Sequence, residues 1–134
     1  DQLSGHDGND QLEGHEGDDA LDGGAGGDML FGGAGADRLI GGAGDDTLYI
    51  SGPGDWVDGG DGWDTLALEN SGDSTSPRII VWEELATGGA ITGVELVSLY
   101  GAGGGDYFVG APNIRNALSG AGGDDQLSGG ALFD

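Results

Sequence analysis

An aliphatic residue recurs at every ninth position through the first half of the chain, in one unbroken register. Most of the positions between two such residues hold glycine or aspartate, which favour turns. The three residues centred on each aliphatic position therefore predict a very short strand whose middle side chain faces inward. The inward positions are Leu3, Leu12, Leu21, Leu30, Leu39, Leu48, Val57 and Leu66.

The polar positions follow the same period of nine. From Gly5 to Ala67 the chain divides into consecutive blocks with glycine at the first, second and fourth positions and an acid at the sixth. Block 50–58 keeps the acid and the aliphatic residue although Ile50, Ser51 and Pro53 replace glycines. The sixth-position residues are Asp1, Asp10, Asp19, Asp28, Asp37, Asp46, Asp55 and Asp64.

Glycines at alternating loop positions allow a positive φ and tight turns, so successive carbonyl oxygens can point to one place. A short acid directly after the turn adds a charged oxygen at the same place. One such turn can bury nothing, whereas stacked turns bury a continuous ladder of leucines. The pattern therefore predicts an all-β stack of repeats with a row of oxygen-rich loops.

The register divides the chain into three parts. Residues 1–67 form the first repeat tract, and residues 101–134 form a second, truncated tract. Between them, residues 68–100 lack the repeat and contain two β-prone runs, 78–82 and 91–100. We expect this insertion to be β-rich, to bind no metal and to pack on the repeats. Both chain ends fall on a sixth position, which predicts a piece of a longer protein.

Charge narrows the choice of partners. The chain has 25 acidic and three basic residues, a net charge of −22 and no cysteine. So acidic a chain cannot neutralise nucleic-acid phosphates, and no apolar run is long enough to insert into a membrane. Carboxylates and carbonyls suit a hard cation. Calcium takes six to eight such oxygens at ~2.3–2.6 Å, whereas magnesium demands a smaller octahedron.

The seven consecutive blocks from Gly5 to Ala67 closely resemble RTX, or haemolysin-type, calcium-binding repeats. That resemblance implies a right-handed parallel β-roll, or β-solenoid, in which two nonapeptides make one turn. Each calcium ion would lie between loops one full turn apart on the same edge. One edge would hold Asp10, Asp28, Asp46 and Asp64, and the other would hold Asp1, Asp19, Asp37 and Asp55.

The same resemblance implies further ligands and about four to eight Ca²⁺ ions in total. In the second tract Asp106 would pair with Asp125, and Asn116 with Asp134. The Asp37–Asp55 site departs from the pattern, because Ile50 and Pro53 stand at loop glycine positions. The carbonyl ligands would come from Gly8, Gly17, Gly24, Gly26, Gly33, Gly35, Gly42, Gly44, Gly60 and Gly62.

The family resemblance also implies a biological setting. RTX proteins of Gram-negative bacteria leave the cell through type I secretion, unfolded in low cytosolic calcium, and fold outside. We therefore expect a secreted, non-catalytic module that folds with calcium and stabilises a larger extracellular polypeptide. Two alternatives stay open: a calcium-dependent carbohydrate-binding accessory module, as in alginate epimerases, and a rigid spacer of a large adhesin. The resemblance also allows the parent protein to be an enzyme such as a protease, lipase or epimerase.

Several side chains allow a second interpretation. Trp56 and Trp63 could form a platform for a glycan together with Trp82, or they could pack under residues 68–100. His6 and His15 occupy second positions of consecutive blocks, so their rings should point to opposite edges and share no zinc ion. Acids that precede a sixth-position aspartate, such as Asp18 and Asp45, are expected to be solvated loop charges and not a catalytic pair.

Overall fold

The computed structural model describes residues 1–51, 54–68, 79–81, 91–94, 96–100, 107–109, 115–119, 124 and 126–128. Every element in this part of the chain is a β-strand, and no helix there could cross a membrane. The strands are β1 (Gln2–Asp7), β2 (Gln11–Glu13), β3 (Ala20–Ala25), β4 (Met29–Phe31), β5 (Arg38–Ala43), β6 (Thr47–Ile50), β7 (Trp56–Asp61), β8 (Thr65–Leu68), β9 (Ile79–Val81), β10 (Ile91–Thr92), β11 (Leu96–Tyr100), β12 (Tyr107–Val109), β13 (Arg115–Ser119) and β14 (Gln126–Ser128).

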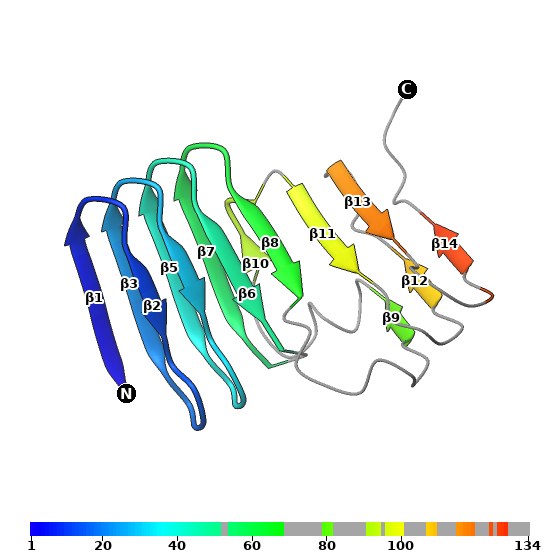
Figure 1. Ribbon diagram of the computed structural model, residues 1–134, viewed down its shortest axis with the longest axis horizontal. Coiled ribbons are helices and arrows are strands. Elements are labelled where there is room, and N and C mark those ends of the chain that lie inside the picture. Colours follow the sequence, from blue (N-terminus) through cyan, green and yellow to red (C-terminus); the bar gives the residue numbers. More distant parts are fainter. Residues whose placement is uncertain are drawn as a thin grey trace.

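Successive strands of the first tract belong alternately to two parallel sheets (Figure 1). One sheet has the order β1-β3-β5-β7-β10, and the other contains β2, β4, β6 and β8 in sequence. Leu3 pairs with Leu21 and Leu12 with Leu30, so strand partners are two blocks apart. Two nonapeptides therefore make one turn of a parallel β-solenoid, and the predicted fold is confirmed.

The strands of the two sheets differ in length. β2 and β4 have the three residues that the sequence predicts, whereas β1, β3, β5 and β7 have six. The longer strands continue into the next loop, because its second and third residues still pair with their counterparts a turn later. Gly24 pairs with Gly42, and Ala25 with Ala43. The prediction of uniformly short strands was wrong for this sheet.

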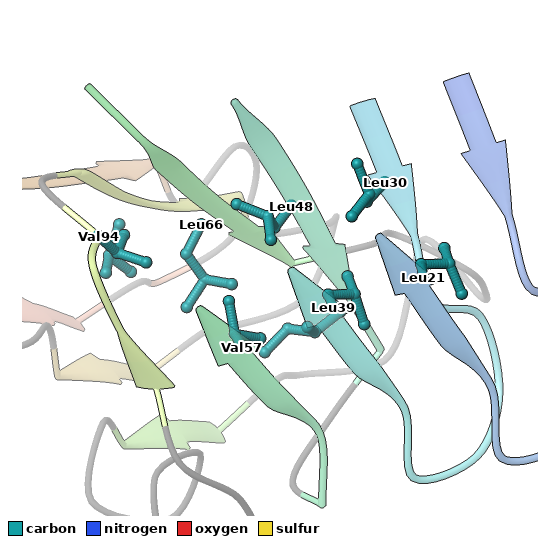
Figure 2. Packing of buried hydrophobic residues seen from close by; sticks show 9 residues of the cluster. Leu21, Leu30, Leu39, Leu48, Val57, Leu66 and Val94 are labelled. Carbon is teal, nitrogen blue, oxygen red and sulfur yellow. The ribbon is translucent and has the colours of Figure 1, made fainter. Parts of the chain in front are cut away.

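The core is a single ladder of aliphatic side chains between the two sheets (Figure 2). Leu21, Leu39 and Val57 come from one sheet, and Leu30, Leu48 and Leu66 come from the other. All six are at most 1% exposed, so the prediction that the eighth position faces inward is confirmed. Leu3 and Leu12 are partly buried against the same cluster.

Strands beyond residue 68 extend both sheets. β10 pairs with β7, and β11 pairs with β8 on one side and with β13 on the other. Val94 and Val97 are buried and join the leucine ladder. The β-prone run 91–100 therefore forms strands as predicted. β9, from the other predicted run, lies in a third sheet of order β14-β12-β9.

Candidate metal sites

Each sixth-position aspartate of the first tract lies directly before a strand, at the end of its loop. Asp19, Asp28, Asp37, Asp46, Asp55 and Asp64 are at most 3% exposed, although carboxylates are almost never fully buried without a partner. Removing an ionised carboxylate from water costs free energy unless a counter-charge or hydrogen bonds compensate. The repeat therefore places its most polar side chain where that compensation is required.

The aspartates of one edge form a continuous hydrogen-bonded ladder. The backbone N–H of Asp10 donates to Oδ1 of Asp28 at 2.8 Å, and the same bond links Asp28 to Asp46 and Asp46 to Asp64. On the other edge the same bond links Asp19 to Asp37 and Asp37 to Asp55, and the N-terminal ammonium of Asp1 donates to Asp19. The structure thus brings together the eight aspartates as the two rows that the sequence predicts. The Asp37–Asp55 contact persists at 2.8 Å despite Pro53.

The second carboxylate oxygen is buried and receives no hydrogen bond in Asp10, Asp19, Asp28, Asp37 and Asp46. It lies against the first glycine of its own loop. A Cβ placed on Gly5 would lie 2.6 Å from Oδ2 of Asp10 and 2.7 Å from the carbonyl oxygen of Gly23, one turn later. At Gly14 the corresponding neighbours are Oδ2 of Asp19 and the carbonyl oxygen of Gly32. A carboxylate oxygen and a carbonyl oxygen thus converge on space that only glycine leaves open.

Burial shifts the proton affinity of these groups. The pKa of Asp46 is raised from 3.8 to about 6 in total: burial is the largest cause, the N–H of Asp28 opposes it, and the carboxylates of Asp64 and Asp28 add to it. Burial also raises the pKa of Asp37, with the charges of Asp19 and Asp18 acting in the same direction. The charged forms of Asp37 and Asp46 are therefore disfavoured in the fold, and a bound cation would offset that cost.

All the glycines predicted to supply carbonyl ligands adopt a positive φ, and so do His6 and His15, which stand at second positions. A Cβ on Gly24 would collide with the carbonyl oxygen of His6, and a Cβ on Gly33 with that of His15. Later turns repeat this contact between glycines, as at Gly42 over Gly24. In neighbouring loops the carbonyl oxygen of one loop therefore lies against the backbone of a glycine in the next loop. A side chain at this glycine would push the two loops apart.

These donors fit a hard divalent cation. Among the residues that the structure describes, no group of three or more His, Cys, Asp or Glu side chains is arranged to hold a metal ion without other ligands. Two carboxylates from adjacent turns, completed by backbone carbonyls, are the oxygen set that calcium accepts. The buried Oδ2 atoms without a donor are the observation that favours a cation at this place.

The family model of the RTX calcium-binding nonapeptide repeat matches the chain in four copies, over residues 1–30, 22–49, 54–74 and 115–134. The chain belongs to this family. The RTX repeat is a structural calcium-binding module and not a catalytic domain, so calcium binding is the property that membership implies. RTX repeats are typical of proteins secreted by type I systems. No curated protein and no solved structure matches the chain significantly.

Of the candidate ligands in the second tract, Asn116 is the one that the structure describes. Asn116 lies within strand β13, in register with Val97 of β11, whereas the aspartates of the first tract lie in loops. Its position therefore differs from the loop position that the sequence predicts. Asp106, Asp125 and Asp134 lie outside the described residues.

The tryptophans proposed as a glycan platform are each covered on one face. The guanidinium of Arg38 lies 4.4 Å from the ring centroid of Trp56, and that of Arg115 lies 5.0 Å from the ring of Trp63. Trp56 belongs to β7, whereas Trp63 lies in the loop before β8. Cation–π contacts thus occupy faces that a sugar ring would use. Trp82 lies outside the described residues.

The fifth position of the repeat has a role that the sequence pattern did not indicate. Asp18 and Asp45 are exposed, as expected, but they are more than solvated charges, because each accepts a hydrogen bond from a backbone N–H one turn later. Asn9 does the same. The available signal was their chemistry, since aspartate and asparagine both offer a short side-chain oxygen. His6 and His15 are exposed, consistent with rings in solvent.

Proposed function

We propose that this RTX module folds by binding calcium between successive turns, and that it thereby stabilises a larger extracellular protein after secretion. The observation that carries the proposal is the row of buried carboxylate oxygens without hydrogen-bond donors. Beside the first glycine of the loop, a carbonyl oxygen of the next turn lies close to this oxygen in Asp10, Asp19, Asp28 and Asp46. Calcium would supply the missing positive charge there. The residues of the chain would supply an oxygen cage and its spacing.

In the first tract the cages would form between aspartates 18 residues apart. Every interior aspartate has one neighbour on each side, so it would serve two cages. On one edge the pairs are Asp10–Asp28, Asp28–Asp46 and Asp46–Asp64, and on the other they are Asp1–Asp19, Asp19–Asp37 and Asp37–Asp55. Sharing of this kind predicts cooperative binding, because filling one cage orders half of the next.

The physical basis of a folding switch is the weakness of the calcium-free fold. Blocks 14–22, 23–31, 32–40 and 41–49 each bury one aliphatic side chain, and only blocks 50–58 and 59–67 bury a second one, Ile50 and Ala67. Stacking the turns also brings like charges together in low-dielectric surroundings. Only the folded chain offers complete cages, so the binding free energy of calcium becomes folding free energy. A site held at 100 times its dissociation constant contributes ~2.7 kcal/mol. Several sites would exceed the usual stability of a small domain.

This behaviour suits a secreted protein. Low calcium inside the cell would keep the chain unfolded for export, and high calcium outside would fold it. The proposal is consistent with the absence of cysteine, which leaves metal as the available cross-link between turns.

Calcium binding and compaction can be tested together. The hydrodynamic radius of the chelated protein, measured by dynamic light scattering, should fall cooperatively as calcium is added, and direct titration calorimetry should give several ions per chain. Magnesium at the same concentrations serves as the control. A radius that stays constant, with no calcium heat above that of magnesium, would contradict the proposal.

A further inference from the structure

A second row of hydrogen bonds runs beside the buried aspartate ladder, at the fifth position of the repeat. Oδ1 of Asn9 accepts from the N–H of Gly27 at 3.0 Å, Oδ1 of Asp18 accepts from Ala36 at 2.9 Å, and Oδ1 of Asp45 accepts from Trp63 at 3.0 Å. Each bond spans 18 residues, and the three occur on both edges of the solenoid. We call each of them a latch.

Each hydrogen bond of the aspartate ladder is called a rung. A latch and a rung join the same two loops, but the donor loop of one bond is the acceptor loop of the other. Asp45 in the earlier loop accepts from the backbone of Trp63 in the later loop at 3.0 Å, while Asp64 in the later loop accepts from the backbone of Asp46 at 2.9 Å. The two bonds lie one residue apart along each loop. Together the two hydrogen bonds close a ring between the loops. This ring restrains both the distance between the loops and the displacement of one loop along the other.

The chain also contains loop pairs without a latch, because the fifth position there is Gly27 or Ala36, neither of which has a side-chain oxygen. Loops 23–28 and 41–46 are joined by the Asp28–Asp46 rung, and loops 32–37 and 50–55 by the Asp37–Asp55 rung. Latched and unlatched junctions therefore exist in one molecule. This contrast allows the latch to be removed at one junction and added at another.

We propose that Asn9, Asp18 and Asp45 are positioning residues that hold adjacent loops at the spacing of a calcium cage and so raise the calcium affinity of that junction. This inference rests on the proposed calcium-binding function. The latch needs only an acceptor oxygen, since Asn9 makes it as well as the aspartates do. Its effect therefore comes from geometry and is separable from the negative charge of an aspartate.

Three variants at one latch separate geometry from charge. Asp45→Ala removes the latch and a charge, Asp45→Asn removes the charge alone, and Asp61→Ala removes a charge from an exposed residue of the partner loop. We expect Asp45→Ala to raise the calcium concentration at the folding midpoint by about two- to tenfold, the range that one hydrogen bond supplies. Asp45→Asn should stay closer to wild type than Asp45→Ala does. Asp61→Ala should match Asp45→Asn.

The reciprocal experiment adds a latch. Gly27→Asn places an oxygen opposite the N–H of Asp45, and Gly27→Ala is its matched control. Both variants bring a Cβ to 3.1 Å from the carbonyl oxygen of Asp45, so only the asparagine oxygen distinguishes them. We expect Gly27→Asn to lower the calcium midpoint relative to Gly27→Ala. This pair keeps the proposal testable if Asp45→Ala fails to fold.

Amide hydrogen exchange gives a readout at the latch itself. In calcium-saturated protein the N–H of Trp63 should exchange faster in Asp45→Ala than in Asp45→Asn. Equal calcium midpoints for Asp45→Ala and Asp45→Asn, or for Gly27→Asn and Gly27→Ala, would overturn the proposal while leaving calcium binding intact. If the wild type binds no calcium, the proposed function fails first, so the two failures are distinguishable.

Discussion

The N–H of Asp28 donates to Oδ1 of Asp46 at 2.8 Å, while the buried Oδ2 of Asp46 receives no hydrogen bond. One carboxylate thus performs two tasks, since its first oxygen joins two turns and its second is directed to a place that lacks positive charge. The first task needs an oxygen acceptor, and the second needs an anion. This division predicts opposite effects for substitutions that separate the two.

Asp46→Asn should stabilise the calcium-free fold and weaken calcium binding. The amide retains an acceptor for the N–H of Asp28 but removes a buried charge that burial and neighbouring carboxylates disfavour. Asp46→Ala should weaken both, because it leaves that N–H without its partner. The concentration of a stabilising osmolyte that induces β signal in chelated protein, and calorimetry in calcium, measure the two effects. Asp22→Ala, at an exposed position, is the control and should change neither strongly.

The calcium-free fold should be more stable in mild acid than at neutral pH. The pKa of Asp46 is raised from 3.8 to about 6, so the folded state binds a proton that the unfolded state has released, and stability falls as pH rises through this window. Calcium binds the ionised carboxylate, so the calcium concentration at the folding midpoint should decrease as the pH rises over the same range. Circular dichroism at pH 5 and pH 7.5 checks both. Asp46→Asn should flatten the dependence, and a calcium-free fold more stable at pH 7.5 would refute it.

Leu39→Ala should destabilise the calcium-bound module by about 2–5 kcal/mol, and Leu39→Asp should prevent folding. Leu39 is fully buried at the centre of the ladder, where it pairs with Leu21 and Val57. Met29→Ala is the control, because Met29 is 41% exposed. Urea denaturation in saturating calcium measures the loss. Normal folding of Leu39→Asp would show that the eighth position does not form the core.

Gly44→Ala should cost about 1–3 kcal/mol more than Gly8→Ala, the usual penalty of an overpacked contact. Both glycines stand at fourth positions with nearly the same φ, +126° and +124°. An added Cβ would collide with the carbonyl oxygen of Gly26 in the first case and would meet nothing within 4 Å in the second. The difference in unfolding free energy thus isolates loop stacking from backbone strain. Equal costs would mean that strain alone fixes these glycines.

Most of the fold and of the candidate site is predictable from the repeat itself. A period of nine in glycine, aspartate and leucine sets the inward row, and the resemblance to RTX repeats implies the pairing 18 residues apart and the two rows of acids. The pattern does not predict the contacts made by its variable positions. The latches of Asn9 and Asp45 occupy a position where Gly27 and Ala36 also occur, so no rule of spacing marks them.

The repeat also predicts less where its register changes. Asn116 follows a stretch with one extra residue, so its assignment to a sixth position depended on where that residue was placed. The strand pairing aligns Asn116 with Val97 and Val97 with Leu66, which is an eighth position. Strand length in the sheet of β1, β3, β5 and β7 depended on backbone pairing at glycines, which have no side chain to reveal it.

Calcium-driven folding is tested most directly by far-ultraviolet circular dichroism during a calcium titration that starts from chelated protein, with magnesium as the control. We predict a cooperative gain of β signal with calcium and none with magnesium at the same concentrations. A spectrum that already shows the full β signal in chelator would contradict the account, because the leucine ladder and the backbone pairing would then suffice without the cation.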